Sequence, residues 1–219
     1  MNSLQIPGRY DFSIPEAQRL SDLAGILADL EAVTRICARC ERLMDGLGQP
    51  TEADGVAWLE ELQSIGDLTF AAVVRYGRTL ASGVRQGIPS DRLASLSADL
   101  QESHAYFKVL RDKYVAHSVS QLEDNQVFVF LSPQFAEQQE AAQITVDRGR
   151  LVTLGIADLR RLSCLAQGLN QAVAKEIESE SSRLLEIARS MSIDSIRAHG
   201  AEAVPIPGNA HAFKVRKKF

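Results

Sequence analysis

The stretch Arg111-Asp112-Lys113-Tyr114-Val115-Ala116-His117 places an arginine and a histidine close together in the chain. An arginine guanidinium stays charged, and its planar fork matches the oxygens of a phosphate. A histidine gains or loses a proton near neutral pH, so it suits a general acid or base. Together these two residue types could hold a phosphate group and move a proton beside it. Arg111 and His117 are therefore the candidate catalytic pair.

The same two residues also have an ordinary structural interpretation. A histidine in the last turn of a helix interacts favourably with the helix dipole and can bond the last carbonyl groups. An arginine beside an apolar stripe is commonly a solvated edge residue. Spacing alone leaves both interpretations open.

A long amphipathic helix over Leu93–Ser118 is the element expected to position this pair. Ser90 or Asp91 can cap its start. Apolar residues recur at steps of three and four, Ser103 interrupts the series, and His117 takes its next position. The stripe comprises Leu93, Leu96, Leu100, Phe107, Leu110 and Tyr114.

Spacing along one straight helix would separate the two side chains. Six residues correspond to about 9 Å of rise and about 240° of rotation. Arg111 and His117 can therefore meet at one phosphate in two ways. Either the helix loosens before His117, or two subunits face each other across a twofold axis.

The run Leu110-Arg111-Asp112-Lys113-Tyr114-Val115-Ala116-His117-Ser118 resembles the signature of the HEPN superfamily of all-helical domains. In that signature a polar residue follows an arginine, and a histidine comes a few residues later. Arg111 and Asp112 match the first positions and His117 the last, with five intervening residues where four are commoner. The run over residues 70–80, FAAVVRYGRTL, is also similar to the second helix of abortive-infection-type HEPN proteins.

This resemblance implies a function and partners. HEPN nucleases dimerise across the motif and cleave RNA without metal. We therefore expect a homodimeric ribonuclease that binds RNA, with a toxin or phage-defence role and an antitoxin or other protein as a further partner. The alternative is a non-catalytic HEPN-like dimeric scaffold that binds a partner protein or a nucleotide.

Residues around the pair are candidates for supporting roles. Asp112 can orient Arg111 or remain a solvated carboxylate, and Lys113 can add positive charge or lower the pKa of His117. Tyr114 fits a core position, although its hydroxyl could reach the cleft.

Four further residues form a possible RNA-binding rim: Arg75, Arg78, His104 and Lys108. His104 and Lys108 share a helix face with Arg111, which could equally be a solvated stripe. By resemblance Arg75 and Arg78 pack near the motif. The alternative is that they form ion pairs with nearby acidic residues, namely Asp99, Glu102 or Asp112.

Composition is that of an ordinary globular protein, with 45% hydrophobic and 24% charged residues. A net charge of −4 argues against nonspecific coating of nucleic acid but is compatible with a local basic site. We find no signal segment and no apolar run that could span a membrane, so a cytoplasmic location is expected. The three cysteines include Cys37 and Cys40 at CxxC spacing, which we interpret as core thiols; no metal or cofactor is expected.

The predicted fold is an all-α, up-down bundle of four long helices with a small β-hairpin insertion before the last helix. The helices are expected near residues 15–46, 52–87, 93–118 and 155–191. The insertion covers about 125–154 and contains two or three short strands, with a turn at Asp147–Arg150. An extended arm (1–14) precedes the HEPN-like domain (15–199), and a basic tail (200–219) follows it.

Overall fold

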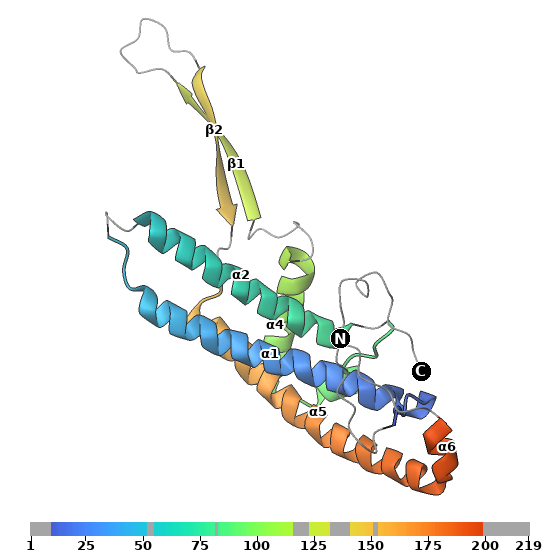
Figure 1. The fold of residues 1–219 in the computed structure, drawn as a ribbon. Coiled ribbons are helices and arrows are strands. Elements are labelled where there is room, and N and C mark those ends of the chain that lie inside the picture. Colours follow the sequence, from blue (N-terminus) through green and yellow to red (C-terminus); the bar gives the residue numbers. More distant parts are fainter. Residues whose placement is uncertain are drawn as a thin grey trace, which may run out of the picture.

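The computed structural model describes most of the chain and contains helices and one hairpin (Figure 1). Residues 1–9 of the predicted arm and residues 200–219 of the predicted tail lie outside the described part. His117 also lies outside it. The described residues are 10–51, 55–81, 83–115, 123–131, 141–150 and 153–198.

Three long helices build the body: α1 (Gln18–Leu47), α2 (Gly55–Leu80) and α5 (Ile156–Ser190). Figure 1 shows α1 running beside both α2 and α5, and the core lies between them. Leu23, Ile26, Leu30 and Val33 of α1 are fully buried there, as helical spacing predicts. The mostly helical class and the hairpin before the last long helix are confirmed, but the part of the chain that the structure describes contains three long helices, so the up-down bundle of four long helices is not confirmed.

The predicted ends of the first and last long helices agree with the structure, whereas the end of the second does not. A short 3₁₀ turn (Pro15–Ala17) precedes α1, since proline is tolerated at a helix start. α2 ends at Leu80 rather than near Gly87. The chain folds back there, because the Ile88 N–H donates to the Thr79 carbonyl at 2.8 Å. Gly87 permits this approach, since a Cβ atom at that position would lie 2.8 Å from the same carbonyl oxygen.

The predicted third helix is broken rather than continuous. It comprises α3 (Ser90–Ala94), α4 (Ala98–Leu110) and a π-helical turn, η2 (Arg111–Val115). The break at 95–97 follows from competing polar groups: the Ser95 hydroxyl donates to the Arg92 carbonyl at 2.7 Å. The Gln101 amide donates to the carbonyls of Ala94 and Leu96. Side chains that bond nearby carbonyls in this way replace the backbone hydrogen bonds of a continuous α-helix.

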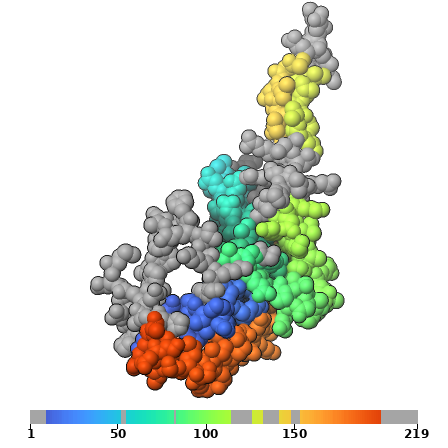
Figure 2. Space-filling view, turned by 90° about the vertical axis from the view of Figure 1, so that its right-hand side faces the viewer, coloured from blue at the N-terminus to red at the C-terminus, as the bar shows by residue number. Residues whose placement is uncertain are grey.

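The insertion is an antiparallel hairpin of β1 (Glu123–Leu131) and β2 (Ala141–Arg150). The turn predicted at Asp147–Arg150 is wrong, because these residues pair with the start of β1 and extend the ladder. The hairpin projects away from the helices (Figures 1 and 2). After α5 the chain forms one more short helix, α6 (Ile193–Ala198), where the sequence predicted only a helix end.

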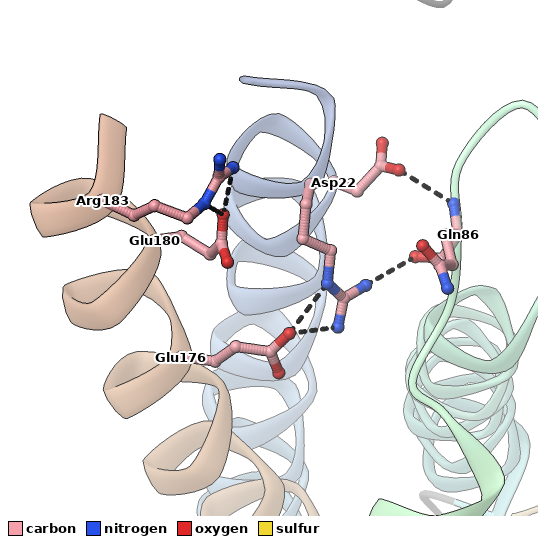
Figure 3. A network of polar contacts seen from close by, with 6 residues as sticks. Asp22, Gln86, Glu176, Glu180 and Arg183 are labelled. Carbon is pink, nitrogen blue, oxygen red and sulfur yellow. Dashed lines mark hydrogen bonds and ion pairs between the residues drawn. The ribbon is translucent and has the colours of Figure 1, made fainter. Parts of the chain in front are cut away.

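A polar network fastens Gln86, in the connection between α2 and α3, to the helices (Figure 3). The buried Asp22 carboxylate accepts the backbone N–H of Gln86 at 3.0 Å. Arg19 binds Glu176 of α5 at 2.7 Å and donates to the Gln86 carbonyl. α1 and α5 thereby hold the chain that leaves α2. Within the described residues, we find no helix that is both long and apolar enough to cross a membrane.

Candidate functional site

Arg111 begins the π-helical turn that ends α4, and its side chain lies on α2. The contact is at Gly77: a Cβ atom there would lie 2.8 Å from Cγ and 3.0 Å from Nε of Arg111. Only a residue without a side chain leaves room for the arginine stem in this position. The group that approaches α2 most closely at Gly77 is therefore the Arg111 side chain.

Asp112 joins the two neighbouring cations. Its Oδ1 accepts from Nη1 of Arg111 at 2.7 Å, and its Oδ2 accepts from Nζ of Lys108 at 3.1 Å. These hydrogen bonds, Arg111 first and Lys108 second, hold the pKa of the Asp112 carboxyl below its ordinary value. The carboxylate therefore stays ionised and orients Arg111. Two cations against one anion leave a local charge of +1.

A shallow hollow of about 180 Å³ opens at this cluster. Its lining combines the three charged residues with Gly77 and Leu80 of α2 and with Ala81, which directly follows that helix. Arg111 and Lys108 are each about half-exposed, so their remaining N–H groups can reach a ligand in the hollow. The space suits a small anionic group rather than a large organic molecule.

His104 lies one turn before Lys108 and binds a buried tyrosine of α2. The Tyr76 hydroxyl and Nδ1 of His104 are 2.6 Å apart. Burial raises the pKa of Tyr76 and is the main cause that lowers the pKa of His104, with the positive charge of Lys108 second. His104 is therefore neutral at pH 7 and joins α4 to α2 beside the cluster.

Arg75 and Arg78 bind an acidic residue that we did not expect. Both contact the buried carboxylate of Asp29 in α1, at 3.2 Å and 3.5 Å, and Arg85 contacts it at 3.0 Å. The predicted pairing with Asp99, Glu102 or Asp112 is wrong, because these arginines face α1 rather than α4. Three guanidinium groups around one carboxylate leave a surplus of two positive charges.

Gly25, Asp29 and Arg85 are the residues around this buried carboxylate that sequence analysis did not identify as site residues. Gly25 lies one helical turn before Asp29, and a Cβ atom at Gly25 would lie 3.0 Å from Nη1 of Arg85. A signal was available for Asp29, since it is an acidic residue at a core position of α1, between Ile26 and Val33. An acidic residue on an apolar stripe indicates a buried ion pair.

The other predicted site residues are less completely described. Lys113 is exposed in the π-helical turn, and Tyr114 lies in the same turn. The structure thus brings Lys108, Arg111 and Asp112 together and places His104 one turn away. It places Arg75 and Arg78 on the side of α2 that faces α1.

The cysteine pair of the CxxC motif lies in the core. Cys37 and Cys40 are fully buried free thiols, and burial raises the pKa of Cys37 to about 12. A thiol with so high a pKa is a poor nucleophile and metal ligand at neutral pH. Among the described residues, no group of histidine, cysteine and acidic side chains could hold a metal ion.

Comparison with known proteins found no match among family models, curated proteins or solved structures. The HEPN resemblance therefore stays a prediction that depends on the residues quoted for it.

Proposed function

We propose that the Arg111 cluster is the phosphate-binding part of a metal-independent ribonuclease site, with His117 as the acid and base. The observation that supports this proposal is the position of the Arg111 side chain. It lies on Gly77, and its Nη1 donates to Oδ1 of Asp112 at 2.7 Å. A guanidinium held in one orientation can stabilise the charge that develops on a phosphate without reorganising during the reaction. The HEPN resemblance assigns the same residue to that role.

The end of α4 supports the participation of His117. Regular α-helical structure stops at Leu110, and a π-helical turn follows over Arg111–Val115. The rotation of a continuous α-helix therefore does not apply between Arg111 and His117. Loosening at this point is one of the two conditions under which these side chains could reach one phosphate. Single π-helical turns are also frequent at functional sites.

The charge distribution supports a polyanionic ligand. The chain carries a net charge of −4, yet the Asp112 cluster has a surplus of one positive charge and the Asp29 cluster a surplus of two. Arg78 directly follows Gly77 in α2, so the two clusters occupy adjoining sides of one helix. An RNA strand with its scissile phosphate at Arg111 could place a neighbouring phosphate near Arg78 and Arg75.

RNA cleavage in EDTA by purified protein tests this function. Wild type is compared with Arg111→Ala and His117→Ala, and Arg189→Ala serves as the matched control because Arg189 is an exposed, ion-paired arginine of α5. We expect the first two changes to reduce cleavage by about 10²-fold or more and the control to retain it. Absence of wild-type cleavage over a wide range of RNAs, or full activity of Arg111→Ala, would contradict the proposal.

A non-catalytic scaffold is the second candidate. The observation in its favour is that Asp112 already binds both Arg111 and Lys108, so one of the two positive charges is compensated within the chain. A scaffold would use these residues to maintain a surface for a partner protein or a nucleotide. Arg111→Ala would then weaken ligand binding, while no variant would differ in RNA cleavage. A toxin or phage-defence role, with an antitoxin as partner, belongs to the ribonuclease proposal.

A further inference from the structure

Three arginines converge on one buried carboxylate between α1 and α2, which run side by side (Figure 1). The Asp29 side chain is 4% exposed and that of Arg85 is 17% exposed, and Nη2 of Arg85 lies 3.0 Å from Oδ2 of Asp29. A buried carboxylate is costly unless a cation pairs with it. One arginine supplies the single positive charge that this requires, and Arg85 is the most buried of the three.

Arg75 and Arg78 are therefore in excess of what Asp29 needs for charge compensation. They lie three residues apart in α2 and are neighbours on its surface, where like charges destabilise a helix. Within the described residues, no second acidic side chain forms an ion pair with either of them. The cluster thus keeps a surplus of two positive charges in a chain of net charge −4. An anion supplied from outside the chain would complete it.

The two arginines can offer N–H groups to such an anion. Their side chains are 44% and 58% exposed, and each guanidinium group carries five N–H donors. Arg75 contacts Asp29 through Nη1, and Arg78 contacts it through Nε, which leaves the terminal nitrogens of Arg78 for a ligand. Because both arginines bind the same carboxylate, their guanidinium groups lie side by side. Asp29 therefore orients both, as Asp112 orients Arg111.

Charge and shape select the ligand. A phosphate monoester carries a charge of about −1.5 to −2 at pH 7 and presents three acceptor oxygens, so it matches the surplus charge and two adjacent guanidinium groups. A phosphodiester or a monocarboxylate carries one charge and would leave one positive charge uncompensated. We propose that Arg75 and Arg78 bind a phosphate monoester, in the orientation that their ion pairs with Asp29 fix.

The monoester has two sources, the terminal phosphate of a nucleic acid or a small phosphorylated molecule. The first source deepens the ribonuclease proposal and to that extent rests on it. An RNA bound at Arg111 would then place its end phosphate on the adjoining side of α2. The anion site itself requires no cleavage, since its residues are distinct from the Arg111 cluster.

Isothermal titration calorimetry with two adenine nucleotides tests the site. Adenosine 5′-monophosphate and adenosine 3′,5′-cyclic monophosphate share a base and a sugar, but the first is a monoester and the second a diester. We expect the monoester to bind the full chain about fivefold more tightly, the factor that one added unit charge provides near a cation in water. Arg75→Gln and Arg78→Gln should each weaken monoester binding by about tenfold, because each removes a hydrogen bond to a charged group.

Two controls separate this site from general charge effects. Arg189→Gln changes an exposed, ion-paired arginine of α5 and should retain monoester binding. Arg111→Ala should also retain it, which distinguishes the site from the neighbouring cluster. Cooperative circular dichroism melting of Arg75→Gln and Arg78→Gln would show that these variants fold, as expected while Arg85 still pairs with Asp29. The proposal is overturned if the two nucleotides bind equally, if neither glutamine variant weakens monoester binding, or if Arg189→Gln weakens it as much.

An oligodeoxyribonucleotide with either a 5′-phosphate or a 5′-hydroxyl distinguishes the two sources. It lacks the 2′-hydroxyl that metal-independent RNA cleavage requires, so binding is measured without turnover. Its phosphorylated form would support a nucleic-acid end if it binds more tightly than both its hydroxyl form and adenosine 5′-monophosphate. Any other order among these ligands would support a small molecule. Absence of RNA cleavage would contradict the ribonuclease proposal and leave the nucleotide binding unchanged, so the two proposals can fail independently.

Discussion

Replacing Gly77 by alanine should displace Arg111 while leaving the fold intact. The added Cβ atom would lie 2.8 Å from Cγ of Arg111, which real contacts do not allow, and the half-exposed arginine can rotate into solvent. Alanine gains about 0.8–1.0 kcal/mol of helix propensity over glycine. Loss of the exposed Arg111–Asp112 ion pair costs about 0.2–1 kcal/mol. The gain in helix propensity and the loss of the ion pair nearly cancel in the free energy of unfolding, so the Tm should change by less than about 4 °C.

The pKa of Asp112 reports the displacement directly. The Arg111 hydrogen bond is the largest cause of its lowered pKa, so Gly77→Ala should raise that pKa towards the ordinary value. Carboxyl NMR titration measures this change, and cleavage should fall by about 10²-fold if Arg111 binds the scissile phosphate. Gly46→Ala is the control, because its added Cβ atom would meet nothing within 4 Å. An unchanged Asp112 pKa in Gly77→Ala, or a loss of stability well above 1 kcal/mol, would refute the reasoning.

Two further predictions concern buried polar groups. Asp29→Asn should lower the free energy of unfolding, measured in urea, by about 2–4 kcal/mol, because three arginines lose their common buried anion. A decrease below about 1 kcal/mol would show that solvent already compensates the charges of these arginines. His104 has a lowered pKa in the folded state, so protons bind the unfolded state more strongly and stability should fall as the pH drops below about 6.5. His104→Gln should flatten this slope between pH 7 and pH 5, and an unchanged slope would assign it to other groups.

Several elements follow from local sequence signals. Pro15 begins the first helical segment, the Gly46–Pro50 region ends α1, and α5 begins directly after Gly155. Apolar spacing also predicted most of the buried face of α1. These features could be predicted because capping, helix propensity and burial periodicity involve residues only a few positions apart. A continuous apolar run over residues 127–131 and an alternating pattern over residues 143–147 indicated the two strands for the same reason.

Local signals were insufficient where competing groups or distant partners decide the structure. The break at 95–97 depends on side chains that bond carbonyls instead of continuing the helix, and the end of α2 depends on a return of the chain to Thr79. Periodicity could place Arg75 and Arg78 on α2 but could not identify Asp29 as their partner. That partner is 46 residues before Arg75 in the chain.

The sequence by itself determined the helical class, the hairpin and the residue types at the candidate site. Tertiary structure decided that Arg111 lies on Gly77, that Asp112 joins it to Lys108, and that the apolar side chains of the β1–β2 hairpin are left exposed. The physical reason is that a periodic pattern reports which side chains avoid water, whereas their partners are set by the packing of distant segments.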